Sequence, residues 1–486
     1  MAELKRPVDR SLAKNLEFLK ERLGIGESFD VIAREFMIAG RKTALLFVDG
    51  FAKDDITLFI LKTIMPLQRE QIALNPVEKI LNHHLPYIEV SELDDLEKAI
   101  ISILSGAPVL LIDGETRAIE IDAREYPARS PEEPDIERVT RGARDGFVET
   151  LVFNTALIRR RIRDPGLRVI HLQVGKRSVT DVALIYIKDI ADPGLVEDVK
   201  SRIEGVTVDG LPMAEKSLEE FIARIGYSPF PRVRYTERPD VAAVHVLEGH
   251  VVIVVDASPS VMIAPSTIFH HMQHAEEFRQ SPLVGTYIRW VRWLAILLSL
   301  LATPLWLALA YQPELLPDFL AFIGAAEVGP IPLYLQFFIA EVGLDIIRMA
   351  TIHTPSPLAT ALGIIAAFLI GDIAIQVGLL IPEVILYMSA AAIGSFATPS
   401  MELSNTFKIF RLLLLALATL FQVPGVLVGL VCMGIWAAAT KSFGVPYLWP
   451  LVPLNLPALV AILLRKPVPV SQSRPAAVRP QDKDRL

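Results

Sequence analysis

The sequence of 486 residues has a single cysteine, Cys432, which lies inside an apolar run. One cysteine cannot form a disulfide within the chain, so a disulfide-stabilised scaffold is excluded. The motifs G-x-x-x-x-G-K-[ST], G-x-G-x-x-G and G-x-S-x-G, which bind nucleotides or position a nucleophile, are also missing. These absences predict a protein that is not an enzyme, with no catalytic residues, no cofactor and no metal.

Charged residues are scarce in one part of the chain. Residues 1–290 hold 82 of the 103 Asp, Glu, Lys and Arg residues, whereas 291–464 hold only 13. The first part has a net charge of −8, which argues against nucleic acid as a partner. Its first ten residues are charged and lack an apolar core, so we expect no cleavable signal peptide. The pattern predicts a large cytoplasmic region followed by a membrane region.

The cytoplasmic region is predicted to contain two similar α/β subdomains, over 1–130 and 131–286. The matching segments are TALLFVDGFAKDD (43–55) with VALIYIKDIADPG (182–194), and GAPVLLIDGETRAIEI (106–121) with GHVVIVVDASPSVMIA (249–264). The offsets of 139 and 143 predict two copies of one unit with a strand, a helix, a second strand and a hairpin. Asp113 and Asp256 match one another after apolar strands, which is typical of aspartates that cap turns.

Three arginines, Arg159, Arg160 and Arg161, end a helical run. Cations complement the dipole at the C-terminal end of a helix, so a solvated, ion-paired helix end is one interpretation. A contact with another subunit or subdomain is the second, which makes the three arginines candidate interface residues. Binding to lipid headgroups is the third.

A second cluster contains His270, His271 and His274, followed by Glu276 and Glu277. His270 and His274 share a helical face at i, i+4, a spacing that can hold a metal ion. No H-E-x-x-H motif and no further ligand accompany them, so structural or interfacial histidines are favoured over a metal site. Protonation sensing also stays open, because histidine titrates near neutral pH.

The membrane region is expected over 287–464. It begins with a collar of aromatic and basic residues: Tyr287, Arg289, Trp290, Arg292 and Trp293. Apolar stretches follow at 291–311, 358–381, 384–398 and 412–439, with a weaker amphipathic one at 331–349. The stretch 412–439 is long, and Pro424-Gly425 interrupts it at its middle. Three basic groups are each expected on the cytoplasmic side of the membrane: the collar, the pair Lys408 and Arg411, and a basic flexible tail at 465–486. Six spans place all three groups on that side, whereas four spans do not. We predict an all-α, multi-pass bundle of four to six spans.

Asp372 is the most informative residue of this region. It lies near the centre of 358–381, where a charge costs about 2.5–3.5 kcal/mol on insertion scales. Gln376 is one turn further along the same helical face. The pair fits either a polar helix–helix contact or a face that lines a path for ions or water. Glu383 and Glu402 are further candidate polar residues, placed at helix ends.

Longer blocks carry a family pattern. They are EEPDIERVTRGARDGFVETLVFNTALIRRRIRD (132–164), VGKRSVTDVALIYI (174–187), VDGLPMAEKSLEEFI (208–222), FPRVRYTERPDVAAVHVLEGHVVIVVDASPSVMIAP (230–265), FHHMQHAEEFRQSP (269–282), ATPSMELSN (397–405) and SFGVPYL (442–448). On these blocks the chain resembles the spore germination A-subunit family and, within it, the stage V sporulation protein AF branch. The resemblance extends from about Asp30 to Leu448.

The resemblance implies a multi-pass protein of the spore inner membrane that acts in germination. It implies a homo-oligomer that forms an ion channel, with the AF branch resembling an accessory component that increases ion release. Other spore inner-membrane germination proteins and membrane lipid are the implied partners.

The hypotheses differ in what the membrane region does. In the first, the cytoplasmic subdomains assemble a ring and helices around Asp372 form a cation path. In the second, the membrane region only anchors a signalling or scaffold protein. In the third and weakest, the chain is an enzyme that acts at the membrane through its histidine cluster.

Overall fold

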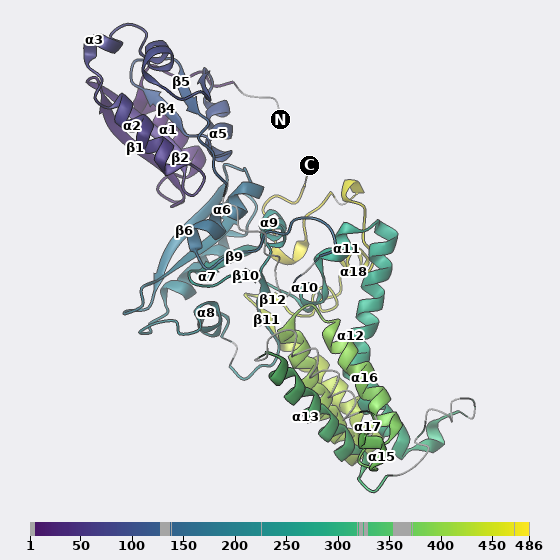
Figure 1. Ribbon diagram of the computed structural model, residues 1–486. Helices are drawn as coiled ribbons and strands as arrows, with labels where there is room; N and C mark the ends of the chain where they lie inside the picture. The colour runs from purple at the N-terminus through teal and green to yellow at the C-terminus, as the bar shows by residue number, and fades with distance from the viewer. Residues whose placement is uncertain are drawn as a thin grey trace.

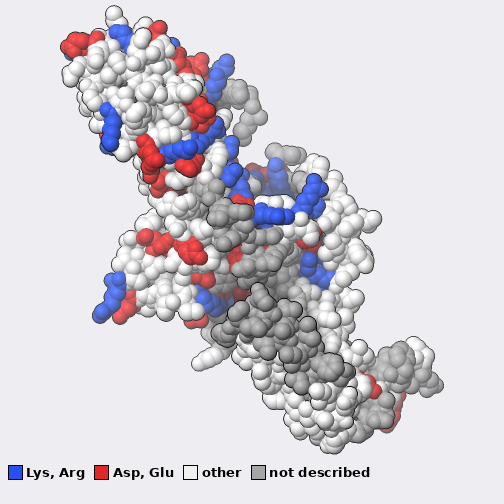
Figure 2. Space-filling view, viewed as in Figure 1, with Lys and Arg blue, Asp and Glu red and all other residues white. Residues whose placement is uncertain are grey.

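The chain divides into an α/β region with two sheets and a helical region, as a computed structural model shows (Figure 1). The structure describes residues 5–485 except 127–136, 138, 225, 318, 320–323, 325–328, 353–370, 372 and 471. On the face drawn in Figure 2, Lys, Arg, Asp and Glu gather over the α/β region, whereas the described surface of the helical region is mostly uncharged. The uneven charge along the sequence therefore corresponds to a division in space.

The first α/β unit is built on a five-stranded antiparallel sheet with the order β1-β2-β4-β5-β3. Its strands are β1 (Val31–Ile38), β2 (Arg41–Val48), β3 (Val90–Leu93), β4 (Val109–Ile112) and β5 (Ala118–Ile121). Its helices are α1 (Leu12–Leu23), α2 (Asp54–Ile64), α3 (Arg69–Ile72), α4 (Pro76–Lys79) and α5 (Leu96–Leu104), with a π-helical turn at Ile80–His84. Leu46 packs with α1 and α5 and Leu45 with α2, because successive strand residues face opposite sides of the sheet.

The second unit repeats this arrangement, with a sheet in the order β6-β7-β9-β10-β8. Its strands are β6 (Leu167–Val174), β7 (Thr180–Ile187), β8 (Arg234–Thr236), β9 (Val251–Val255) and β10 (Val261–Ala264). Its helices are α6 (Leu151–Arg161), α7 (Pro193–Glu204), α8 (Ala214–Ala223) and α9 (Pro239–Leu247). Helices α6 and α9 cover one face and α7 and α8 the other, so both sheets are buried between two helical layers.

The two units also share their hydrogen-bonding devices. The backbone N–H of the first residue of α1 donates to Asp113 Oδ1 at 3.0 Å, and that of α6 donates to Asp256 Oδ1 at 2.9 Å. Asn15 and Asn154 each bond the backbone six residues earlier through both amide atoms. The aspartates thus cap the N-termini of helices more than 100 residues away, rather than only the turns in which they lie.

The helical region follows the second unit. Its helices are α10 (Ile268–Met272), α11 (Ala275–Arg279), α12 (Pro282–Tyr311), α13 (Leu333–Ile352), α15 (Ala374–Gln376), α16 (Pro382–Phe396), α17 (Met401–Ala439) and α18 (Leu456–Leu463), with 3₁₀ turns at Pro313–Leu315, Val468–Val470 and Ala476–Val478 and a hairpin of β11 (Lys441–Ser442) and β12 (Val445–Pro446). Among the described residues, α12 and α17 are long and apolar enough to cross a membrane. Most of the apolar stretch 358–381 lies outside the described residues.

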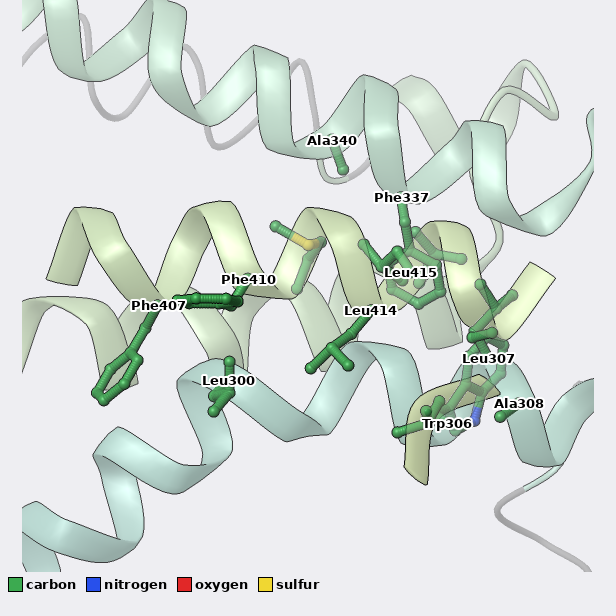
Figure 3. Packing of buried hydrophobic residues seen from close by; sticks show 14 of the residues in the cluster. Leu300, Trp306, Leu307, Ala308, Phe337, Ala340, Phe407, Phe410, Leu414 and Leu415 are labelled. Carbon is green, nitrogen blue, oxygen red and sulfur yellow. The ribbon is translucent and has the colours of Figure 1, made fainter. Parts of the chain in front are cut away.

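Residues from α12, α13, α16 and α17 form the core of the helical region. Figure 3 shows Leu300, Phe337, Phe410 and Leu414 pointing into the space between these helices. The core is apolar, yet the outer faces of the same helices also carry large exposed apolar side chains, such as Leu294. Apolar exposure of this kind marks surfaces that contact lipid or another protein.

Helix α17 is a hairpin of two antiparallel arms. Its backbone leaves helical geometry at Gln422, where φ is 57° and ψ is −137°. Phe410 and Trp436 are 26 residues apart, which is about 39 Å along a straight helix, but their ring centroids are only 5.9 Å apart. The interruption that Pro424-Gly425 indicates in the sequence is therefore a reversal of the chain. The arms 401–421 and 423–439 are about 31 and 25 Å long.

Phe230 connects the second α/β unit to the helical region. Its ring lies 5.3 Å from that of Phe410 and 5.5 Å from that of Tyr447, so it belongs to the helical core although it precedes β8. Ser442 Oγ donates a hydrogen bond to the carbonyl of Arg232 at 2.5 Å. The two regions therefore share side chains and backbone contacts.

The C-terminal segment differs from the flexible tail expected at 465–486. Residues 472–485 lie against the second α/β unit, and the yellow C-terminal segment returns to the neighbourhood of α9 in Figure 1. Val478 is 2% exposed and Ala477 is 6% exposed. Burial of these apolar side chains explains why a segment with several charges packs on the unit.

Candidate functional site in the helical region

A buried ion pair joins α13 to α17. Arg411 Nε lies 3.1 Å from Glu341 Oε2, and Arg411 Nη2 lies 2.5 Å from Glu341 Oε1. The two side chains are only 3% and 4% exposed. A charge without water needs a partner, and a guanidinium and a carboxylate satisfy each other through two parallel contacts. The pair therefore makes two charges tolerable inside an apolar bundle.

Arg411 also contacts the other long helices. Its Nη1 donates to the carbonyl of Ser299 in α12 at 2.5 Å and to Ser395 Oγ in α16 at 3.4 Å. One side chain thus binds groups from α12, α13 and α16 while it belongs to α17. We call Glu341, Ser299, Ser395 and Arg411 the Arg411 site.

A second ion pair lies about one helical turn away. Lys408 of α17 pairs with Asp345 of α13, and these side chains are 23% and 34% exposed. The acids are spaced i, i+4 and the bases i, i+3, so each set lies on one helical face. The four charges sum to zero. Lys408 and Arg411 were expected to mark the cytoplasmic side, and that orientation stays a prediction.

The residues predicted from the sequence lie elsewhere. Asp372 is outside the described residues. Gln376 is exposed and ends α15, a helix of three residues. Glu383 lies in the first turn of α16 and Glu402 in the first turn of α17, where a carboxylate complements the helix dipole. Glu402 accepts a hydrogen bond from Ser400 Oγ at 2.7 Å.

Sequence reasoning missed the Arg411 site because its charges lie 70 residues apart. The sequence does contain a signal. Glu341 and Asp345 share one face of an apolar helix, and Lys408 and Arg411 share a face of another. Acids and bases at matching spacing in two apolar helices favour ion pairing between them.

The three arginines of α6 contact groups within the chain. Arg159 is buried, and its Nε and Nη2 lie 2.8 and 3.0 Å from the two carboxylate oxygens of Asp30 in the first unit. Arg161 Nη2 lies 2.7 Å from Asp145 Oδ1. The Arg160 guanidinium lies 4.4 Å from the centre of the Tyr126 ring. Arg159 thus ties one α/β unit to the other, while a role of these arginines between subunits stays a prediction.

The histidines lie where the second unit meets the helical region. The ring centroids of His245, His250 and His270 are 5.1–5.8 Å apart. His271 hydrogen-bonds Ser266 Oγ and Ser400 Oγ, both at 3.2 Å, and so joins the second unit to the start of α17. In the part of the chain that the structure describes, no three or more His, Cys, Asp or Glu side chains are arranged to hold a metal ion.

Burial keeps these histidines neutral. Desolvation lowers the pKa of His250 to about 4 and the pKa of His271 to about 3. It also lowers the pKa of His245 and His270 well below the ordinary value, and the nearby Arg234 guanidinium adds to the effect. A proton on any of these rings would be a buried charge close to another positive charge.

Two features define the class of protein to which the chain belongs. It combines a duplicated α/β region with a helical region in which two helices are long and apolar enough to cross a membrane. A family model described as Bacillus/Clostridium GerA spore germination protein matches residues 17–477. The chain therefore belongs to the GerA spore germination family.

Individual relatives agree with this assignment. The chain is 49% identical to stage V sporulation protein AF of Bacillus subtilis (strain 168) over 481 residues, which cover 99% of this chain and 98% of the relative. It is 31% identical to spore germination protein KA of the same organism, covering 99% and 90%, and 31% identical to spore germination protein GerLA of Bacillus cereus, covering 96% of each. The resemblance to a spore germination family is thus confirmed.

A solved structure is also similar. It is the crystal structure of the N-terminal domain of the A subunit of the Bacillus megaterium spore germinant receptor GerK3. The identity is 27% and the TM-score 0.42, and the match covers 55% of this chain and 99% of the other.

Proposed function

We propose that the chain is a multi-pass subunit of an oligomeric ion channel in the spore inner membrane and promotes ion release during germination. The observation that carries the proposal is the Arg411 site, in which two charged groups, a hydroxyl and a backbone carbonyl from four helices meet inside an apolar bundle. Buried charge within apolar helices is costly and typically marks ion pathways or their gates. The exposed apolar faces of these helices support contacts with lipid and with further copies of the chain.

The chain enters and leaves the helical region at the same end. The backbone N–H of Arg465 donates to Thr286 Oγ1 at 3.1 Å, and Trp290 Nε1 donates to the carbonyl of Leu463 at 3.0 Å. A chain that returns to its point of entry crosses a membrane an even number of times. Helix α12 and the two antiparallel arms of α17 account for three crossings. We infer that α13 and α16, which pack against these helices, add two more. The apolar stretch 358–381 supplies the sixth if it spans, as its sequence predicts.

Ion flux through liposomes tests the channel. Reconstituted wild-type chain, alone or with other germination proteins, is expected to release trapped cations. Asp372→Asn should slow this release, since the sequence places the carboxylate at the centre of a span. Asp94→Asn, an exposed change in the first α/β unit, is the matched control and should conduct as the wild type does. Unchanged flux in Asp372→Asn at equal protein level would remove Asp372 from the path.

A non-conducting scaffold is the second candidate function. The observation that favours it is the pairing of all four charges in the Arg411 and Lys408 contacts, because such pairs also serve as static links between helices. A scaffold releases no ions from liposomes, either alone or with its partners. The absence of flux under both conditions would therefore favour the scaffold over the channel.

A further inference from the structure

In the first α/β unit, the residues that follow β5 pack against the turn that follows β2. The N–H of Lys53 donates to the carbonyl of Ala123 at 2.9 Å, and the N–H of Glu125 donates to the carbonyl of Phe51 at 2.7 Å. The Tyr126 ring packs edge-on against Phe51, with centroids 5.4 Å apart. Residues 123–126 thus cover the turn that follows β2.

In the second unit, a distant segment occupies the corresponding place. The chain after β10 continues into the helical region, so it does not cover the turn after β7. Ile190 corresponds to Phe51 at the offset of 139, and the N–H of Gln481 donates to its carbonyl at 2.9 Å. The Gln481 side-chain amide also donates to the carbonyls of Lys188 and Ala191, at 2.9 and 2.6 Å. Gln481 therefore reproduces the contact that Glu125 makes in the first unit.

The side-chain contacts correspond as well. Gly106 and Gly249 precede the central strands with φ of 97° and 99°. A Cβ at Gly106 would lie 3.1 Å from Phe51, and a Cβ at Gly249 would lie 3.3 Å from Val478 and 3.5 Å from Ile190. Val478 and Pro480 of the C-terminal segment therefore lie close to Gly249 and Ile190, and we call this contact surface of the second unit the seat.

Polar contacts close the ends of the same segment. Arg474 Nε donates to the carbonyl of Leu247 at 3.0 Å, and its Nη1 lies 2.7 Å from Asp482 Oδ2. Arg485 pairs with Glu248, the residue before Gly249. The segment is thus held at both ends and through its middle.

We propose that residues 472–485 form a clasp, a detachable peptide that completes the second α/β unit and ties the exit of the helical region to it. The seat selects a peptide whose 3₁₀ turn ends in a small aliphatic residue and which carries a glutamine three positions later. The occupant is the segment of the same chain. Arg465 is anchored at the start of α12, and the seven residues from there to 472 reach at most about 25 Å, which favours the nearest unit.

Peptide binding tests the clasp. A labelled peptide of residues 472–485 is added to the purified chain truncated after residue 470, in detergent, and its fluorescence anisotropy is measured. We expect saturable binding, with at least tenfold weaker binding for peptides that carry Val478→Asp or Gln481→Ala. A Lys483→Ala peptide is the matched control and should bind normally, because this segment uses only the backbone carbonyl of Lys483. Equal binding of the Val478→Asp peptide would overturn the proposal.

A second measurement uses the full-length chain, because the truncated chain could fail to bind the peptide simply by misfolding. Full-length protein with Val478→Asp should accept the free peptide, whereas the wild type, whose seat is filled, should not. Equal binding by the two proteins would contradict a clasp.

Cross-linking decides which chain supplies the clasp. In a Cys432→Ser background, cysteines replace Ile190 and Pro480, whose side chains both lie near Gly249, and a short bis-maleimide joins them. A product of monomer size on a denaturing gel is expected. A product of dimer size would show exchange between copies and would overturn the assignment to the same chain.

Discussion

At the residue scale, Arg411 is a buried charge in the helical region. Its side chain is 3% exposed and binds groups from three neighbouring helices. A buried ion pair contributes little net stability compared with an apolar pair, but loss of one partner leaves a buried charge without compensation. Replacing Arg411 alone should therefore lower the free energy of unfolding, whereas replacing Arg411 and Glu341 together should change it little.

This asymmetry gives a prediction for Arg411→Met. We expect the single change to lower the free energy of unfolding by about 3–5 kcal/mol, because Glu341 stays buried and unpaired. The double change Arg411→Met with Glu341→Leu should recover most of the loss. Thermal unfolding in detergent measures both.

Lys408→Met is the matched control for this prediction. The Lys408–Asp345 pair is partly exposed, so its loss should cost no more than about 1 kcal/mol. Equal destabilisation by Arg411→Met and Lys408→Met would contradict the special position of Arg411.

At the element scale, the reversal of α17 depends on a strained residue. Gln422 has φ and ψ of 57° and −137°, a region that glycine adopts readily and other residues avoid. Just beyond it, a Cβ at Gly425 would lie 2.3 Å from the carbonyl oxygen of Leu417, so the two arms approach too closely for a side chain there. A strained glutamine and an obligatory glycine together form the tip of the hairpin.

The tip gives a prediction for Gln422→Gly. Relief of the backbone strain should raise the free energy of unfolding by about 1 kcal/mol, since such conformations cost about 1–3 kcal/mol and glycine loses part of that gain in entropy. The midpoint of thermal unfolding in detergent is the measurement. Gln422→Ala keeps the Cβ and hence the strain, so it should bring no gain. If alanine stabilises the chain as much as glycine does, the strain at this residue is not the cause.

At the scale of the whole molecule, the histidine cluster makes the junction between the two regions sensitive to acid. Five of the nine histidines lie there with lowered pKa values: His245, His250, His270, His271 and His274. Unfolded histidine binds a proton near pH 6.5, but the folded cluster does not. The unfolded chain therefore holds more protons below that pH, and stability falls as the pH falls.

The expected pH window runs from about 6.5 down to about 4, the folded pKa of His250 and His274. Within this window, each histidine that stays neutral in the folded state lowers the free energy of unfolding by about 1.4 kcal/mol for each unit by which the pH falls. Glu219 and Glu248 partly offset this loss, because burial raises their pKa values. Thermal unfolding across this range should show a smaller pH slope for His271→Asn than for the wild type.

His83→Asn is the matched control for the pH prediction. His83 is exposed in the first α/β unit, away from the cluster, so the slope should stay that of the wild type. A slope that His271→Asn leaves unchanged would contradict the role of the cluster.

Much of the α/β region was predictable from the sequence. Strands that bury both faces are apolar throughout, and the duplicated segments kept the same spacing, so β2, β4 and their counterparts β7 and β9 follow from pattern alone. The matched Asp113 and Asp256 were visible for the same reason. What they cap was not, because each helix N-terminus comes from a segment more than 100 residues earlier.

The candidate site was less predictable. Asp372 stood out because it is a lone charge in an apolar stretch, whereas Glu341 and Arg411 looked like ordinary charges in weaker segments. Only packing shows that Glu341 faces Arg411, since a contact between distant helices depends on how they cross. The Pro424-Gly425 pair signalled an interruption, but the backbone at Gln422 turns that interruption into a reversal.

The sequence by itself determined the division into charged and apolar regions, the duplication and the family, because each depends on local composition or on order along the chain. The tertiary structure decided what distant segments do to one another. The C-terminal segment has the charge of a flexible tail, yet it is packed because a turn near Ile190, almost 300 residues earlier, offers a seat for Val478. Contacts of that kind depend on proximity in space, which composition and periodicity do not encode.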